Sequence, residues 1–285
     1  VEIIHIQELG GVSKAIQAGT DIARRLVIEV SGIQRQPVDV SNIVMSIKCG
    51  GSDTTSGMAS NCVIGYVADK LVDLGATVIF GETTEFIGGE HLLARRAVSK
   101  EVGDKILKIV DDMELRAKSL GCDMRKGQPT PGNIEGGLSS IEEKSLGAIM
   151  KSGSKPIQGV LGYTERVTDQ KGLWIKDTPG REPEILTGMA ATGAQVMMFS
   201  TGRGAPQGFP SMPVIKICGN PNTYQRMEED MDINAGRIIT GEKTIEEVGE
   251  EAFAKLIRTL SGEMTKNEAI QYITSIDIQC LGPVI

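Results

Sequence analysis

In the segment Ile47-Lys48-Cys49-Gly50-Gly51-Ser52-Asp53-Thr54-Thr55-Ser56-Gly57, an apolar run gives way to a glycine pair and then to several hydroxyl side chains. The residues before it, 43–47, predict a buried strand, and residues 58–74 predict a helix. Glycines at such a turn let the backbone approach a ligand closely, and the hydroxyl groups can cap the helix, whose N-terminus favours anions. The segment therefore predicts a strand, a turn and a helix, with a loop that can hold a carboxylate or a phosphate.

Cys49 lies at the end of the predicted strand, which is where ligands bind in open α/β sheets. Its thiolate can serve as a metal ligand. The same position also suits a small thiol that is simply buried in a tight turn. Both interpretations stay open at this point.

The remaining sequence alternates between strand-like and helix-like stretches. Strands are predicted at 1–6, 76–80, 156–162, 173–176, 194–200 and 213–218, and helices at 12–29, from about residue 90, at 102–120 and at 140–151. Possible capping boxes stand at Ser139 with Glu142 and at Thr244 with Glu247. The alternation predicts an α/β fold of mainly parallel sheets with flanking helices.

A stretch rich in glycine and proline, residues 127–137, predicts a linker. We therefore expect two α/β subdomains. The first, residues 1–130, carries the Lys-Cys-Gly-Gly-Ser-Asp loop, and the second, residues 131–285, carries a Thr-Gly-Arg-Gly loop at 201–204.

Composition excludes several classes of protein. The 285 residues are 40% hydrophobic with a net charge of −7, which disfavours broad binding to nucleic acid or to an anionic membrane surface. No apolar run reaches the roughly 20 residues that a membrane span needs. Five scattered cysteines without a Cys-x-x-Cys pair favour a reducing compartment. We expect a cytoplasmic protein that acts on a small molecule.

Polar side chains gather in three loops that follow predicted strands: 49–56, 82–91 and 201–204. Together they offer thiols, carboxylates and an imidazole, which can hold Fe(II), Mn(II) or Zn(II), although the spacing matches no standard metal motif. Glu85 is a solvated loop charge in the alternative interpretation. Neither glycine-rich loop has the spacing of a dinucleotide fingerprint or of a Walker loop.

Several cations are candidate anion-binding groups. His91 and Arg95 stand four residues apart on one predicted helix face, where they can grip an anion or form ordinary helical ion pairs. Arg203 between two glycines suits bidentate carboxylate binding, and an exposed turn arginine is the alternative. Lys48 and Lys216 precede strand-end cysteines and would add positive charge.

These loops, read in order, resemble the altronate/galactarate dehydratase family, which also includes the large subunit of sulfolactate sulfo-lyase. The resemblance covers nearly the whole chain and rests on Lys48-Cys49-Gly50-Gly51-Ser52-Asp53, Gly89-Glu90-His91 with Arg95-Arg96, Asp177-Thr178-Pro179-Gly180, Thr201-Gly202-Arg203-Gly204 and Asp232-Ile233-Asn234-Ala235-Gly236. It implies an Fe(II)- or Mn(II)-dependent lyase that removes water, or sulfite, from a 2-hydroxy acid. Gly-Glu-His and Thr-Gly-Arg-Gly look more like the sugar-acid dehydratases, whereas Cys218-Gly219-Asn220-Pro221 looks more like the sulfo-lyase.

The resemblance also implies further residues ahead of Val1 and often a small N-terminal domain or subunit. We therefore expect a fragment of the whole enzyme, which leaves open whether this chain alone is active, and we expect a homo-oligomer. The alternatives to a sugar-acid dehydratase are a carbon–sulfur lyase and a metabolite-binding module without catalysis.

Our hypothesis for the site combines the residues with the resemblance. Elimination next to a carboxylate needs a base for the Cα proton and stabilisation of the enediolate charge. Catalysis is assigned to Glu85, His91 and Cys49; metal binding to Cys49, Glu85, His91 and Cys218; and substrate binding to Ser52, Asp53, Arg95, Arg203 and Lys48.

Overall fold

The computed structural model describes residues 2–273 and 275–282, and it divides into two compact units, one up to Asp39 and one from Val40 onward. The first unit contains α1 (Ile6–Leu9) and α2 (Val12–Ser31). The predicted strand at 1–6 is wrong over its described part, because residues 2–5 have no regular structure and residue 6 opens a helix. Residues 2–6 have no hydrogen-bonding partner strand, and Ile3 and Ile6 are exposed. Val1 lies outside the described residues.

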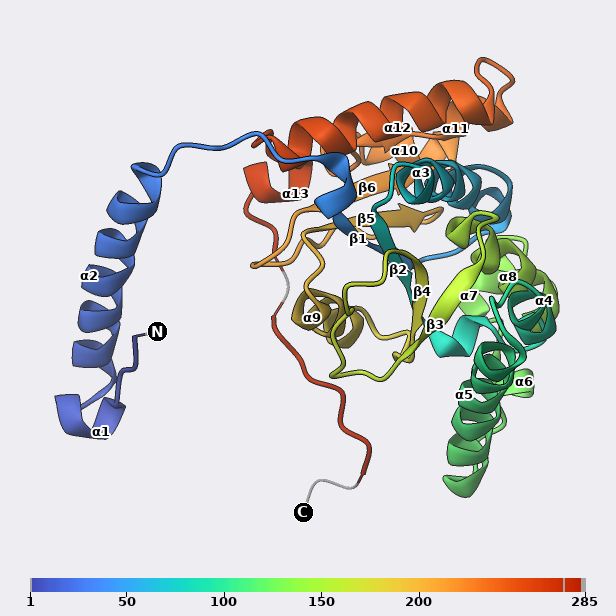
Figure 1. The fold of residues 1–285 in the computed structure, drawn as a ribbon, viewed down its shortest axis with the longest axis horizontal. Helices are drawn as coiled ribbons and strands as arrows, with labels where there is room; N and C mark the ends of the chain where they lie inside the picture. The colour runs from blue at the N-terminus through green and yellow to red at the C-terminus, as the bar shows by residue number, and fades with distance from the viewer. Residues whose placement is uncertain (1, 274, 283–285) are drawn as a thin grey trace. The chain divides into compact units, whose positions relative to one another are not determined.

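The second unit is built on one seven-stranded sheet (Figure 1). Every pair of neighbouring strands is parallel, and the strand order is β3-β4-β2-β1-β5-β6-β7. The strands are β1 (Val44–Cys49), β2 (Thr77–Phe80), β3 (Ile157–Leu161), β4 (Gly172–Lys176), β5 (Val196–Thr201), β6 (Val214–Cys218) and β7 (Ile233–Asn234). The central strands are almost wholly buried and rich in apolar residues, as expected when helices cover both faces.

Helices cover the two faces of the sheet (Figure 1). One face packs against α3 (Asn61–Asp73), α5 (Lys100–Ser119) and α12 (Ile245–Leu260), and together they form the larger apolar core. The other face packs against α9 (Glu182–Thr192) and a smaller core. Because side chains alternate along a strand, Ile47 and Cys49 of β1 face the larger core side, and Lys48 faces the α9 side.

The shorter helices complete the unit. They are α4 (Glu90–Arg95), α6 (Met124–Gly127), α7 (Pro131–Glu135), α8 (Ile141–Ile149), α10 (Pro221–Arg226), α11 (Gly236–Ile239) and α13 (Lys266–Ala269). The capping box of Thr244 and Glu247 at the start of α12 is confirmed. The one predicted at Ser139 and Glu142 is wrong by one residue, because Ser140 caps α8 and accepts from the backbone N–H of Glu143.

The predicted parallel sheet with flanking helices is confirmed, but two α/β subdomains are not shown. Strands from both sides of residue 130 enter the same sheet, since β1 pairs with β5 and β2 pairs with β4. The stretch at 127–137, which we interpreted as a linker, contains α7, and Asn133 on α7 donates to the backbone oxygen of Ser52. This hydrogen bond ties the stretch to the loop that follows β1.

Within the described residues, no helix combines the length and the apolar character that crossing a membrane requires.

The connections place a site at the carboxyl ends of β1 and β5. From β1 the chain moves to β2 on one side, whereas from β5 it moves to β6 on the other side. Neighbouring parallel strands with diverging connections leave a crevice at their carboxyl ends, where ligands of open α/β sheets bind. The loop that begins at Cys49 lies at this crevice.

Candidate active site

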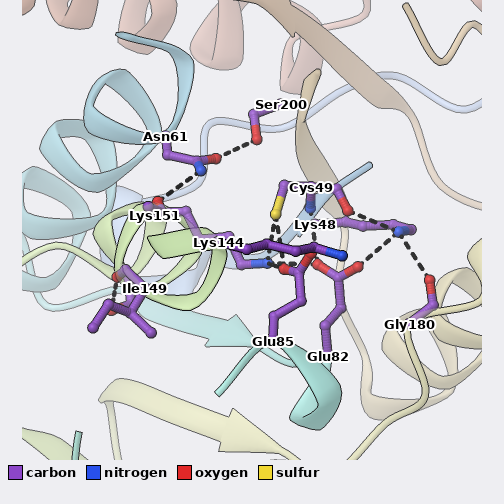
Figure 2. Close-up of polar contacts among 12 residues, drawn as sticks. Lys48, Cys49, Asn61, Glu82, Glu85, Lys144, Ile149, Lys151, Gly180 and Ser200 are labelled. Atoms are coloured by element: carbon purple, nitrogen blue, oxygen red, sulfur yellow. Dashed lines mark hydrogen bonds and ion pairs between the residues drawn. The ribbon is translucent and has the colours of Figure 1, made fainter. Parts of the chain in front are cut away.

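Five buried side chains form a network of charged and sulfur groups at the ends of β1 and β2, which we call the lysine–glutamate cluster (Figure 2). Its members are Lys48 and Cys49 at the end of β1, Glu82 and Glu85 after β2, and Lys151 in the short helical turn Met150–Ser152. Each of the five is less than one-tenth exposed. Charges buried to this degree must be paired, and these are.

Glu82 is the centre of the hydrogen-bond network. Its Oε1 accepts from Lys48 Nζ at 2.7 Å, and its Oε2 accepts from Lys151 Nζ at 2.5 Å and from the backbone N–H of Cys49 at 2.9 Å. The residue has φ 70° and ψ 63°, a left-handed conformation that is unusual for glutamate. Its backbone N–H donates to Thr178 Oγ1 at 2.8 Å, which helps to hold that conformation. Backbone strain of this kind is typical of functional sites.

Lys151 joins three side chains of the cluster. Its Nζ donates to Glu82 Oε2 at 2.5 Å, to Glu85 Oε2 at 2.7 Å and to Cys49 Sγ at 3.1 Å. The Cys49 thiol in turn donates to Glu85 Oε2 at 2.8 Å. An ammonium group has three N–H donors, so all the donors of Lys151 are used within the cluster.

These contacts set the protonation states. Burial by itself would raise the pKa of Glu85, but the ammonium groups of Lys151 and Lys144 and the hydrogen bond from Cys49 lower that pKa to about 2. Burial strongly raises the pKa of the Cys49 thiol, and the Glu85 carboxylate raises it further. Burial would lower the pKa of Lys151, but the Cys49 sulfur and the carboxylates of Glu82 and Glu85 raise it well above its ordinary value. The cluster therefore holds a carboxylate, a neutral thiol and an ammonium group.

Close packing of two backbones places Lys151. The turn Met150–Ser152 lies against Gly65 of α3, where a Cβ atom would come within 2.3 Å of the Met150 carbonyl oxygen. Gly57 and Gly147 make a second close approach, since a Cβ atom on Gly57 would lie 2.9 Å from Gly147 Cα. Glycine is required at both contacts, and together they bring the end of α8 and the following turn down to the end of β1.

A cavity of about 350 Å³ opens beside the cluster. Lys48, Cys49, Glu82 and Glu85 form one wall, and other polar side chains line the rest, namely Ser52, Thr84, Gln128, Thr130, Asn133, Lys144, Glu182 and Arg203. Lys144 is half-buried and lines the cavity without belonging to the cluster. Its positive charge helps to lower the pKa of Glu85. A concave site with a few converging charged groups is the usual form of a small-molecule site.

The loop after β1 is held by Asp53. Its Oδ1 accepts from the backbone N–H and from the hydroxyl of Ser56, and its Oδ2 accepts from Asn220 Nδ2 at 2.9 Å. The sequence assigned Asp53 to substrate binding and the capping role to hydroxyl side chains, whereas the structure gives Asp53 the capping contacts. Glycine is needed opposite this carboxylate, because a Cβ atom on Gly202 would lie 2.0 Å from Asp53 Oδ1.

Arg203 stands between two cavities. It lines the cavity beside the cluster and also a second one of about 370 Å³, whose lining includes Asp53, Asn220 and Arg226. Its guanidinium group donates to the backbone oxygen of Gly132 and to Glu135 Oε2. Arg203 therefore lies where an anion could reach it, as the sequence suggested, and it is paired with α7 in this structure.

Six of the nine residues assigned from the sequence lie outside the cluster: Ser52 and Arg203 line the cavity beside it, whereas Asp53, His91, Arg95 and Cys218 do not. His91 and Arg95 are exposed on α4, and neither lines the cavity beside the cluster. Cys218 is buried at the end of β6, where its Sγ contacts the backbone oxygen of Asn220 at 3.4 Å. Because β5 runs between β1 and β6, the strands of Cys49 and Cys218 are roughly 10 Å apart.

Sequence reasoning did not assign Lys151, Lys144 or Glu182 to the site. Lys151 reads as the last residue of a helix, where a lysine is expected for reasons of helix stability alone. Lys144 falls inside the predicted helix 140–151, where an exposed lysine is ordinary. Glu182 stands in the first turn of α9, again a position where a carboxylate is ordinary. The only sequence signal was their proximity to glycine- or proline-rich turns.

Cys49, Glu82 and Glu85 have the donor chemistry of a site for a divalent metal such as iron, manganese or zinc. One donor atom from each of the three lies within 4.8 Å of the others, and this is the metal-ligand group found among the described residues. The space between these atoms, however, is occupied by Lys151 Nζ, which donates a hydrogen bond to each of them. The donor set suits a metal, but its present arrangement does not accommodate one.

Comparison with known proteins gives a consistent result. The sequence pattern of the C-terminal part of D-galactarate/altronate dehydratases matches residues 40–280. The chain is 40% identical to the beta subunit of (2R)-sulfolactate sulfo-lyase from Chromohalobacter salexigens, over 92% of this chain and 68% of that protein. It is 40% identical to galactarate dehydratase (L-threo-forming) from Escherichia coli, over 89% and 48% respectively. It is 32% identical to altronate dehydratase from Bacillus subtilis, over 92% and 52%. The chain thus spans about half the length of these two dehydratases.

Proposed function

The chain belongs to the D-galactarate/altronate dehydratase family, and from that premise we propose that it carries the active site of a lyase. The reaction we propose is elimination of water from a sugar acid of the altronate or galactarate type, giving a 2-keto-3-deoxy acid. The observation that carries the proposal is the cavity at the ends of β1 and β2, where an ionised Glu85 lies beside buried ammonium groups.

Glu85 is the group we propose as the base. It lines the cavity, and its hydrogen bonds from Cys49 and Lys151 both go to Oε2, which leaves Oε1 to take a proton from the substrate carbon. Removal of that proton creates negative charge on the substrate carboxylate. Fixed positive groups at the site of developing charge are among the strongest catalytic devices that a protein has.

Lys144 and Arg203 are the groups we propose for the substrate carboxylate. Both line the cavity and both are at least partly accessible, so they can pair with an incoming anion without being buried alone. The backbone of the Gly50-Gly51 turn lines the same cavity, with Gly51 at φ 61°, and brings main-chain groups to its wall. His91, Arg95 and Cys218 are not part of this proposal, because none of them lines this cavity.

One observation favours a second reaction, the elimination of sulfite. The chain covers 68% of the sulfo-lyase subunit but about half of each dehydratase. Elimination of sulfite from a 2-hydroxy acid needs the same base and the same charge stabilisation. We therefore propose it as the alternative activity, with a carbon–sulfur bond broken in place of a carbon–oxygen bond.

The family resemblance brings Fe(II) or Mn(II) into the proposal for the whole enzyme. Such an ion, when bound, would withdraw charge from the substrate carboxylate and hydroxyl. We assign no step to it at the lysine–glutamate cluster, because Lys151 fills the space between the ligand atoms. We propose that the protein is a cytoplasmic homo-oligomer. We also propose that further N-terminal residues or a separate subunit complete the enzyme, because the dehydratases are about twice as long as this chain.

The test is an assay of the protein, alone and with any N-terminal part or subunit supplied, on galactarate, altronate and (2R)-sulfolactate. A keto acid without sulfite supports the dehydratase, and sulfite release supports the alternative. Glu85→Gln should lower kcat by about 10²–10⁴, whereas Glu101→Gln, an exposed change on α5, should leave it unchanged. Binding without turnover in every combination would overturn both lyase proposals and favour a metabolite-binding module.

A further inference from the structure

We propose that Lys151 is the resident cation of the Cys49–Glu82–Glu85 group, and that a divalent metal cannot bind among these three side chains while Lys151 is in place. The inference goes beyond the proposed reaction and does not depend on which substrate the protein uses. It concerns how the buried carboxylates are neutralised.

The distances support an ammonium ion as the occupant. Lys151 Nζ lies 2.5 Å from Glu82 Oε2, 2.7 Å from Glu85 Oε2 and 3.1 Å from Cys49 Sγ. The contact to Glu85 has the length of a charge-assisted hydrogen bond, about 2.7–2.9 Å, and the contact to Glu82 is slightly shorter. Metal bonds to the same atoms are shorter, about 2.0–2.2 Å for carboxylate oxygen and about 2.3 Å for thiolate sulfur with zinc. The three donor atoms thus surround a nitrogen at hydrogen-bonding distance.

The charge balance supports the same conclusion. The two ammonium groups of Lys48 and Lys151 pair with the two carboxylates of Glu82 and Glu85. With Cys49 as a thiol, the cluster is neutral. Adding a divalent ion to it would leave two uncompensated positive charges in a buried site, or one if the thiol lost its proton. Burying unpaired charge is strongly unfavourable, so a metal would have to displace an ammonium group.

The packing around Lys151 opposes that displacement. The side chain is fully buried, and its backbone turn is pressed against Gly65, where there is no room for even one more carbon atom. Next to it, Ser152 donates to the Ile149 oxygen at 2.7 Å and accepts from the Arg96 guanidinium group at 2.9 Å, which closes the turn. The fixed turn keeps the Lys151 backbone close to the three donor side chains, and displacement of the ammonium group requires a fully buried side chain to move.

Titration of residues 1–285 with Co(II) tests the inference, because a cobalt–thiolate bond gives an absorption band that ordinary oxygen ligation lacks. The unaltered protein should show no thiolate band that depends on Cys49, as judged against Cys49→Ser. Lys151→Met removes the ammonium and leaves the three donors facing one another. This variant should bind Co(II) at least about 100-fold more tightly than the unaltered protein, with a band that disappears in the double variant with Cys49→Ser.

Lys144→Met is the matched control, since it removes a lysine that lines the same cavity but makes no contact with Cys49. Like the unaltered protein, it should show no thiolate band that depends on Cys49. If Lys151→Met folds poorly without metal, its melting temperature should rise on addition of Co(II), and that of the unaltered protein should not.

A Cys49-dependent thiolate band in the unaltered protein would overturn the inference, and this measurement needs no lysine variant. The result is also separate from the proposed reaction. Loss of the proposed function would appear as absence of turnover, with no effect on the cobalt spectrum.

Discussion

Lys216 is the buried lysine for which the structure provides no hydrogen-bond acceptor. The other fully buried lysines, at 48, 151 and 176, donate to carboxylates or carbonyl groups, but Lys216 Nζ has no such partner among the described atoms. It lies 3.4 Å from the centre of the Phe199 ring, its neighbour across the sheet in register. Burial lowers the pKa of Lys216 to about 7, Glu182 opposes this shift, and the positive charge of Lys48 adds to it.

Lys216→Met should therefore stabilise the protein, and more so in acid than in base. A lysine whose pKa falls on folding is destabilising when it is charged in both states, so its full cost applies below pH 7. The cost fades as the pH rises from 7 to 10.5, by about 1.4 kcal/mol per pH unit. Urea unfolding of both proteins at pH 6 and pH 9 measures the difference. An exposed change such as Lys118→Met should show no trend with pH, and a gain for Lys216→Met that did not vary with pH would contradict the shifted pKa.

Glu85 gives the opposite pH dependence. Despite burial, which acts to raise it, the pKa of Glu85 is lowered to about 2 by Lys151 and its neighbours. A carboxyl group whose pKa falls on folding contributes stability above its unfolded value, near 4.5, and loses that contribution as the pH drops toward 2. Glu85→Gln should therefore lower the free energy of unfolding by roughly a few kcal/mol at pH 7, and by progressively less below pH 4.5. The free energy of unfolding at pH 7 and pH 3 checks this, and a cost that is equal at both pH values would show that Glu85 is not held in ionised form.

At the scale of the element, the contact between α3 and the turn Met150–Ser152 is sensitive to a small change. Gly65 lies inside α3, where alanine would normally stabilise a helix by about 1 kcal/mol relative to glycine. Here the added Cβ atom would lie 2.3 Å from the Met150 oxygen and 3.2 Å from the Gly153 nitrogen. Both of these are backbone atoms and cannot rotate away.

Gly65→Ala should consequently destabilise the protein by about 1–3 kcal/mol in spite of its better helix propensity. It should also push the turn outward and loosen Lys151 from the carboxylates. Thermal unfolding gives the stability, and the Co(II) band described above reports the loosened cluster. Gly127→Ala is the control, because no atom lies within 4 Å of the Cβ position there. Equal stabilities for the two variants would show that the turn yields without cost.

Much of the element layout follows from local sequence. The strand predicted before Cys49 and the helix after it were correct within a few residues, because an apolar run bounded by glycine has few alternatives. The sequence predicts no strand at the two-residue β7, since so short a strand depends wholly on pairing with β6. The strand predicted at 1–6 fails for the same reason. A strand exists only where a partner does, and pairing is not a local property.

The site was predictable to a smaller extent. Cys49 and Glu85 could be named because they directly follow strands, and parallel strands bring their carboxyl ends to one edge. Lys151 could not, because its position depends on backbone contacts at Gly65 and Gly57, each between segments more than eighty residues apart. His91 and Arg95 were correctly placed on a helix, but the face of α4 that they occupy is exposed. Helical spacing alone does not decide which face meets the cavity.

For the whole molecule, the predicted division at residue 130 and the observed division at residue 39 have different origins. Glycine and proline at 127–137 indicate a local break in regular structure, but the contacts of the sheet cross that break. The observed division follows the distribution of the apolar core. Every residue of the two core clusters has a number of 40 or higher, and α2 buries only Ala15 among its twenty residues. The family pattern also begins at residue 40.

Residues 40–285 should therefore fold without residues 1–39. All seven strands, both apolar cores and the lysine–glutamate cluster belong to this part. Deleting residues 1–39 should therefore leave the urea midpoint and the denaturant slope unchanged within error. Far-ultraviolet circular dichroism followed through urea unfolding, on residues 1–285 and on residues 40–285, makes the comparison. Leu71→Ala in 40–285 calibrates it, because loss of this fully buried leucine should cost about 2–5 kcal/mol. A midpoint that fell as far on truncation as with Leu71→Ala would mean that the first unit contributes to the stability of the sheet domain.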